Sequence, residues 1–138
     1  MKYYAVYDTN VLVSAFLTKK KDSATVRVVE EMFSETITPL YNQEILNEYE
    51  EVLSRSKFMF SKETVRQLIE AIRRFGYEVH PTPTNEVLVD MNDLVFYEIV
   101  MEKRDEDAYL ITGNLKHFPV RDYIVTPAEM IGILEGAR

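Results

Sequence analysis

Carboxylate side chains stand at places in this chain where they could hold a metal ion. Asp8 directly follows Tyr3–Tyr7, a short segment with the aromatic and β-branched composition of a buried strand. Asp93 precedes a run that is apolar nearly all round. Oxygen ligands select Mg²⁺ or Mn²⁺ over zinc, and the chain has no cysteine that could supply a thiolate. Two carboxylates about 4 Å apart repel by roughly 4 kcal/mol, so a cluster of them needs a bound cation or a shared proton.

A predicted helix over residues 42–53 carries four glutamates, and its periodicity separates them into two pairs. Glu44 and Glu51 lie nearly opposite the apolar stripe of this helix, as solvated glutamates do. Glu48 and Glu50 lie on the two flanks of the stripe, where they are half sheltered. Periodicity alone does not choose between Glu48 and Glu50 as a site residue.

Polar residues also follow the predicted strand that ends at Thr112. Gly113 and Asn114 are common turn formers, yet the Thr112 hydroxyl and the Asn114 amide could face the same pocket as Asp8. The carboxyl ends of parallel strands meet at one edge of a sheet, where ligands bind. Asn10, two residues after Asp8, could brace the Asp8 carboxylate by a hydrogen bond.

Asp8 and Asp93 also have an ordinary structural interpretation, because each precedes a predicted helix where aspartate commonly serves as the N-cap. At a helix N-terminus the dipole favours the ionised carboxylate by about 0.3–1 kcal/mol, so Asp93 is expected to stay charged. The two histidines lack ligand spacing to a partner. His80 is predicted to lie on the surface and His117 near the rim of the pocket.

The elements that position these residues alternate along the chain. Predicted strands cover residues 3–7, 36–40, 77–80, 108–112 and 123–125. Predicted helices cover residues 11–17, a stretch capped by Asp22 or Ser23, and residues 42–53, 61–74 and 93–103, with a last helix from Pro127. Alternating strands and helices indicate a parallel sheet covered on both faces. We therefore predict a three-layer α/β/α sandwich in one domain over residues 1–138.

The composition limits the classes of function. The chain has 138 residues and a net charge of −7, so any contact with nucleic acid must be local rather than a broad basic face. Local basic groups occur at residues 19–21 and, with six basic residues, at 54–75. The absence of cysteine favours the cytoplasm, and residues 3–7 are too short for a signal peptide or a membrane anchor.

Four short motifs, taken in order, resemble those of the PIN-domain nucleases, a superfamily that includes the toxins of many bacterial toxin–antitoxin pairs. They are YDTNVLVSA at residues 7–15, ILNEYEEVL at 45–53, DMND at 90–93 with FYE at 96–98, and AYLITGN at 108–114. The resemblance covers nearly the whole chain. It implies a Rossmann-like sandwich that hydrolyses single-stranded or looped RNA with Mg²⁺ or Mn²⁺ and leaves a 3′-hydroxyl.

The same resemblance assigns roles to individual residues. It implies that Asp8, Glu48 and Asp93 are catalytic metal ligands, and it thereby selects Glu48 over Glu50. Asn114 stands at a fourth catalytic position, where the family usually has aspartate. An amide oxygen is a poorer ligand than a carboxylate, so we expect a second metal to bind weakly or only with substrate.

The resemblance also implies supporting residues and partners. Asn10, Thr112 and Asp90 match supporting positions around the acids. The lysines best placed at the rim to bind RNA phosphates are Lys19, Lys20, Lys21 and Lys116. A homodimer and a separate antitoxin chain are the expected protein partners, and no membrane contact is expected.

Two alternatives stay open from the sequence alone. Asn114 keeps open a PIN fold that has lost catalysis and acts as an RNA- or protein-binding module. A receiver-like, Mg²⁺-binding signalling domain has a similar size and acidity. The receiver fold needs an acceptor aspartate after a middle strand, and none follows the predicted strand at residues 36–40.

Overall fold

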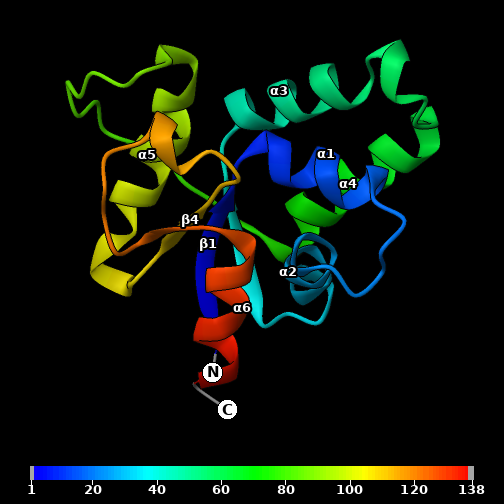
Figure 1. Cartoon of the computed structure of the whole chain (residues 1–138). Coiled ribbons are helices and arrows are strands. Elements are labelled where there is room, and N and C mark those ends of the chain that lie inside the picture. Colours follow the sequence, from blue (N-terminus) through cyan, green and yellow to red (C-terminus); the bar gives the residue numbers. More distant parts are fainter. Residues whose placement is uncertain (1, 137–138) are drawn as a thin grey trace.

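The computed structural model describes residues 2–136, which form one sheet with helices around it (Figure 1). The strands within this range are β1 (Tyr3–Tyr7), β2 (Ile37–Tyr41), β3 (Tyr77–Glu78), β4 (Tyr109–Ile111) and β5 (Ile124–Val125). They lie in the order β3-β2-β1-β4-β5, and every pair of neighbours is parallel. The chain moves outward from β1 to β3 and then crosses back to β4. The strand order therefore reverses at β1, which is where α/β sheets bind ligands.

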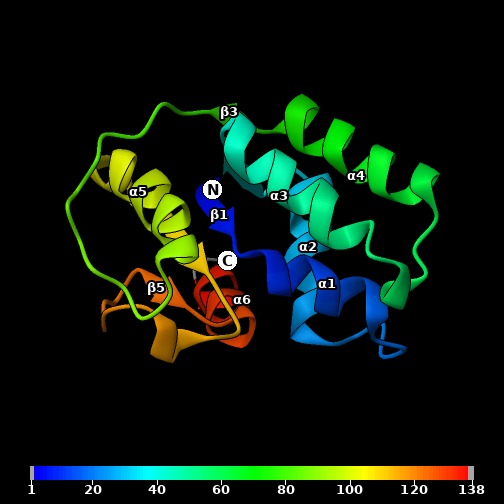
Figure 2. The same cartoon turned by 90° about the horizontal axis from the view of Figure 1, so that it is seen from above.

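The helices cover the two faces of the sheet unequally. They are α1 (Thr9–Leu17), α2 (Ala24–Phe33), α3 (Gln43–Leu53), α4 (Lys62–Phe75), α5 (Leu94–Glu102) and α6 (Pro127–Gly136). Figure 2 shows α5 alone on one side of β1, with α1, α2 and α4 on the other, and α6 packs against α2. In Figure 1, α3 lies across the end of β1 that leads to α1. The predicted three-layer α/β/α sandwich is confirmed.

Several helices begin where their capping residues predict. Ser23, Asn42 and Ser61 each accept a hydrogen bond from the backbone N–H three residues later. Pro127 occupies the first turn of α6, where its fixed φ suits the helix and its missing N–H costs nothing. The starts of α2, α3, α4 and α6 therefore coincide with local signals in the sequence.

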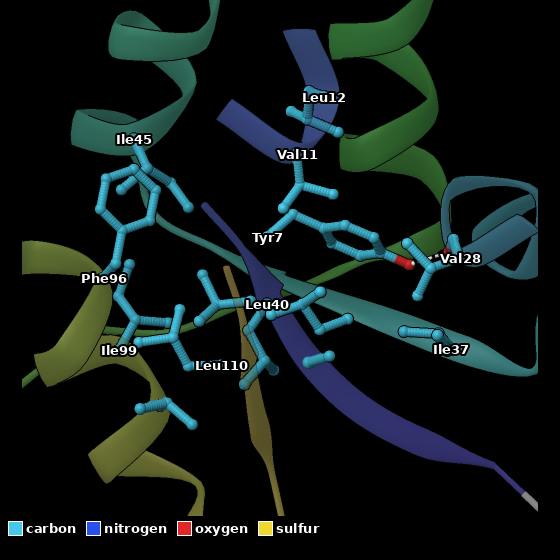
Figure 3. Packing of buried hydrophobic residues seen from close by; sticks show 14 of the residues in the cluster. Tyr7, Val11, Leu12, Val28, Ile37, Leu40, Ile45, Phe96, Ile99 and Leu110 are labelled. Atoms are coloured by element: carbon cyan, nitrogen blue, oxygen red, sulfur yellow. Dashed lines mark hydrogen bonds between the residues drawn. The ribbon is translucent and has the colours of Figure 1, made fainter. Parts of the chain in front are cut away.

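The core joins the layers through aliphatic and aromatic side chains (Figure 3). Phe96 and Ile99 of α5 are fully buried, as is Leu110 of β4. Tyr7 is buried on the side of α2, where its hydroxyl donates to the Val28 carbonyl at 2.7 Å (Figure 3). The buried Tyr7 hydroxyl thus has a hydrogen-bond partner, and this bond fixes the position of β1 relative to α2.

The structure also departs from the predicted elements. β3 has two residues instead of the predicted four, and residues 79–90 form no regular element. This segment contains Pro81 and Pro83, which lack the backbone N–H that a strand donates to its neighbour. Short 3₁₀ turns occur at Ser56–Phe58 (η1), Met91–Asp93 (η2), Arg104–Glu106 (η3) and Leu115–His117 (η4). Within residues 2–136, no helix combines the length and the apolar character that crossing a bilayer requires.

Gly76 directly follows α4 and lies against the backbone of β2, and we predict that its replacement is destabilising. A Cβ at Gly76 would lie 2.4 Å from the Ile72 carbonyl oxygen and 2.6 Å from that of Pro39. Both are backbone atoms, so Gly76→Ala is expected to lower the free energy of unfolding by at least about 1–3 kcal/mol in urea denaturation.

Gly132→Ala is the matched control for that substitution. Gly132 lies inside α6, and a Cβ there meets no atom within 4 Å. Alanine should therefore be neutral or stabilise by up to about 1 kcal/mol through helix propensity. Equal losses of stability in both variants would contradict the packing argument.

Candidate active site

Asp8 lies directly beyond β1, at the reversal point of the sheet. Its backbone N–H donates to the Ile111 carbonyl at 2.9 Å, which ties the ends of β1 and β4 together. Its side chain is 6% exposed and does not cap α1. Instead the fully buried Thr112 hydroxyl donates to Asp8 Oδ2 at 2.7 Å. The capping interpretation of the Asp8 side chain is therefore wrong, and its carboxylate belongs to a polar site.

Glu48 is brought toward Asp8 by the placement of α3. The buried Tyr49 hydroxyl donates to the backbone carbonyl of Tyr7 and so anchors α3 over the end of β1. The Thr9 hydroxyl donates to Glu48 Oε2. Glu50, on the other flank of the helix, is exposed. The contact to Thr9 was not predicted, and the one sequence signal for it is a hydroxyl residue directly after Asp8.

Asp93 is the last residue of η2, immediately before α5. Its side chain makes no capping hydrogen bond. The imidazole Nδ1 of His117 lies 3.3 Å from Asp93 Oδ2, which makes an ion pair when His117 is protonated. This Asp93 oxygen is buried and accepts no well-aligned hydrogen bond, and no other buried side-chain nitrogen or oxygen in residues 2–136 lacks one. His117, which was predicted near the rim of the pocket, thus contacts one of the acids while its side chain is partly exposed.

Two predicted supporting residues have other partners. Asn10 was expected to brace Asp8, but its Oδ1 accepts a hydrogen bond from the Gly113 N–H at 3.4 Å. Thr112 supplies the contact to Asp8 instead, so Asn10 links the first turn of α1 to the loop after β4. Asp90 Oδ1 accepts from the Asn92 N–H at 3.0 Å and caps η2.

Thr112 and Asn114 extend the polar site beyond β4. The Thr112 hydroxyl donates to Asp8 and also accepts the Asn114 N–H at 3.0 Å, so one buried group organises the turn and the carboxylate. The Asn114 side chain lines an open depression together with Asn10 and Ser14. The predicted contact of the Thr112 hydroxyl with Asp8 is thus observed, whereas a place for the Asn114 amide beside Asp8 stays a prediction.

Burial raises the pKa of all three acids. For Asp8 it raises the pKa from 3.8 to about 6; the hydrogen bond from Thr112 lowers the pKa, and the charge of Asp93 raises it. Burial also raises the pKa of Glu48, against the hydrogen bond from Thr9 and with the charge of Asp8. The pKa of Asp93 is raised by burial first and then by Asp90.

This pattern corrects one expectation and supports another. The dipole argument predicted a readily ionised Asp93, but burial and Asp90 outweigh the dipole and raise its pKa. The charges of the three acids are nevertheless coupled, because Asp8 is affected by Asp93, Glu48 by Asp8, and Asp93 by Glu48. Side chains from three separate parts of the sequence thus share one electrostatic environment.

The residues present suit a hard divalent cation. Asp8, Glu48 and Asp93 offer oxygen atoms alone, and Oδ2 of Asp93 has an unused acceptor position in a buried setting. Within residues 2–136, however, no three acidic or histidine side chains converge closely enough to form a ready-made metal cluster. Instead, Asp8 contacts Thr112, Glu48 contacts Thr9, and Asp93 contacts His117. Their role as metal ligands stays a prediction.

The four predicted RNA-binding lysines lie at two positions around the site. Lys116 is exposed in η4, between Asn114 and His117. Lys19, Lys20 and Lys21 are exposed in the loop after α1. That nine-residue helix is about 14 Å long, so these three lysines lie beyond the site and not at its rim.

The fold and the site define an α/β protein with an acidic centre at the carboxyl end of its parallel sheet. A family model described as PIN domain matches residues 4–116. The chain therefore belongs to the PIN-domain family, which is generally of nuclease type. A search of curated proteins finds no significant match to it.

Proposed function

We propose that this protein is a divalent-metal-dependent ribonuclease that cuts single-stranded or looped RNA, and that it is the toxin of a toxin–antitoxin pair. One observation carries the proposal. Asp8, Glu48 and Asp93 come from three separate parts of the chain, and all lie in a shared electrostatic environment at the reversal point of the sheet. Membership of the PIN-domain family supports the same reaction class.

In this proposal Asp8, Glu48 and Asp93 hold the cation. When bound, it supplies Lewis-acid chemistry by making a water molecule more acidic and by offsetting charge on the phosphate. Thr112 holds the Asp8 carboxylate through its hydroxyl, and Thr9 holds Glu48 in the same way. Such partners of ligands fix side-chain orientation, and their loss typically costs about 10–100-fold in metal affinity or activity.

The substrate and the acidic centre are both negative, so RNA needs positive groups near the site. Lys116 is the closest in sequence to the predicted catalytic residues, and Lys19, Lys20 and Lys21 extend the basic surface. The homodimer, the antitoxin partner and the cytoplasmic location stay predictions of the same proposal.

Chelation gives the first test of metal dependence. Purified protein should cleave a labelled single-stranded RNA in Mn²⁺ or Mg²⁺, stop in excess EDTA, and recover when Mn²⁺ is restored in excess. The products should carry 3′-hydroxyl ends, which a 3′-end ligation assay detects. Cleavage that persists in EDTA, or products ending in 3′-phosphate, would contradict the proposed chemistry.

A second candidate is an RNA- or protein-binding module without catalysis. Asn114 favours it, because an amide oxygen is a poorer metal ligand than the aspartate usual in the family.

We predict that Asn114→Asp raises the affinity for Mn²⁺ about tenfold, because a carboxylate binds hard cations better than an amide. Isothermal titration would measure this. Asn47→Asp is the matched control, because it adds the same charge on the exposed surface of α3. Equal gains in both variants, or none in Asn114→Asp, would exclude a metal-binding role for position 114.

A further inference from the structure

A second cluster, separate from the acids, lies where the end of α1 meets the connection between α3 and α4. The Phe58 and Phe60 rings are stacked, with centroids 5.7 Å apart and planes at 14°. Phe16 of α1 contacts Phe60 at 5.7 Å between centroids. Phe16 is 37% exposed, and the other two rings are half-buried. These rings are therefore held together, yet they are accessible from solvent.

Lysines surround the same rings. Five of the eight lysines in the sequence belong to two segments, 19–21 and 57–62, that the contact between Phe16 and Phe60 brings together. We call the whole set the aromatic–lysine patch: Phe16, Phe58, Phe60, Lys19, Lys20, Lys21, Lys57 and Lys62. All five lysines are exposed, and within the described residues none of them forms an ion pair.

The local charge is opposite to that of the chain. Neither residues 16–21 nor residues 54–62 contain an acid, although the protein has a net charge of −7. Glu63, the first acid after Lys62, is bound to Arg66. Asp22 follows Lys21, and Glu50 lines a pocket with Phe60 and Lys62, so the five lysines of the patch outnumber these nearby acids. The Lys57 ammonium lies 5.1 Å from the centre of the Phe58 ring, which places positive charge and an aromatic face at the same spot. The patch therefore suits a ligand that is both anionic and aromatic.

The backbone between the stacked rings has an uncommon conformation. Met59 adopts φ 59°, in the left-handed region that non-glycine residues seldom occupy, and its own side chain is 89% exposed. The turn at Met59 therefore places the Phe58 and Phe60 rings side by side, while the Met59 side chain itself stays in solvent. Met59 is the left-handed C-cap of η1, and Glu35, Asn85 and Asp107 also have positive φ, so this conformation accounts for the pairing of the rings and is not itself a sign of function.

We propose that the aromatic–lysine patch binds single-stranded RNA and extends the path of the substrate away from the acidic centre. This inference rests on the proposed ribonuclease function. Bases stack on exposed aromatic rings, and lysines hold the phosphates, which is how sequence-tolerant binding of single strands works. α1 begins beside the acids and ends at the patch, about 14 Å away, and Figure 2 shows α1 and α3 running to the same side.

Charge favours RNA over a second copy of this chain. In a two-fold symmetric dimer the same surface meets itself, so the five unpaired lysines would face their own equivalents. A polyanion removes that repulsion and releases counterions. The test must therefore also be able to detect a dimer contact at the patch.

Fluorescence anisotropy in EDTA, with a short labelled single-stranded RNA, measures binding without cleavage. Phe58→Ala should raise Kd by about 5- to 150-fold, as the loss of one stacked base does. Lys57→Gln with Lys62→Gln should reduce the slope of log Kd against log salt by about 1.4, since single strands give roughly 0.7 per phosphate. This second variant changes exposed residues alone, so it tests the patch even if Phe58→Ala folds poorly.

Matched controls change exposed side chains of the same kind elsewhere. Tyr77→Ala removes a 47% exposed ring on β3, and Lys2→Gln removes an exposed lysine near the start of β1. Both should bind RNA as the unaltered protein does. RNA binding by the patch would be contradicted if the patch variants bind RNA as the unaltered protein does. It would also be contradicted if Phe58→Ala loses dimerisation but keeps its affinity for RNA. Intact patch binding without any metal-dependent cleavage would instead count against the ribonuclease and leave the patch standing.

Discussion

The Asp8→Asn variant is expected to lose RNA cleavage by more than about 100-fold while staying folded. Loss of an outer partner of a metal ligand typically costs about 10–100-fold, and Asp8 is proposed as a ligand itself. Asparagine keeps an oxygen that can accept the Thr112 hydroxyl, so the local geometry should survive. Initial rates on single-stranded RNA in saturating Mn²⁺ measure the effect.

Glu50→Gln is the control for that measurement. Glu50 is an exposed acid on α3, the helix that carries Glu48, so activity should stay within about twofold. Equal cleavage by Asp8→Asn and the unaltered protein would show that the assigned site is wrong. Cleavage by neither protein would favour the alternative of a binding module.

The same substitution is expected to stabilise the metal-free protein. The pKa of Asp8 rises from 3.8 to about 6 in the folded state, which corresponds to up to about 3 kcal/mol of destabilisation when the group is charged. Burial is the main cause, and repulsion from Asp93 adds to it. Asp93→Asn should act in the same direction, because the Asp93 pKa is also raised. Urea denaturation in EDTA at pH 7 measures both gains.

The pH dependence of that gain follows from linkage. Because the folded state binds the Asp8 proton more tightly, this carboxyl favours folding below pH 3.8, and the benefit is lost as pH rises through about 6. The advantage of Asp8→Asn should therefore be large at pH 7 and shrink steadily toward pH 4. A variant that is less stable than the unaltered protein at pH 7, or equally stabilised at both pH values, would contradict a raised pKa of the buried Asp8.

Much of the fold follows from local patterns in the sequence. Apolar segments such as Tyr3–Tyr7 and caps such as Asn42 and Ser61 specify strands and helix starts without distant contacts. β3 is shorter than its composition suggests: Val79 still donates its N–H to the Tyr41 carbonyl of β2, but residues 79–90 form no regular element. The 3₁₀ turns were not predicted, since three residues are too few to establish a periodic pattern.

One contact at the candidate site could be predicted from the sequence, whereas the others could not. Asp8 and Thr112 could be placed at one edge because both follow parallel strands, yet they are 104 residues apart in sequence. Two other contacts depend on how α3 and η4 pack against the sheet. They are the hydrogen bond from Thr9 to Glu48 and the contact between His117 and Asp93. Burial set by that packing also decides the pKa of Asp93, which its position before a helix did not reveal.

The most direct test of the proposed metal centre is a crystal structure of the protein soaked in Mn²⁺, with anomalous scattering recorded for the metal. We expect a peak between the carboxylates of Asp8 and Asp93, with Glu48 turned toward it directly or through water, and we expect this peak to be lost in Asp8→Asn. A peak elsewhere on the protein, or none at full Mn²⁺ loading, would contradict the claim that these acids bind a divalent cation.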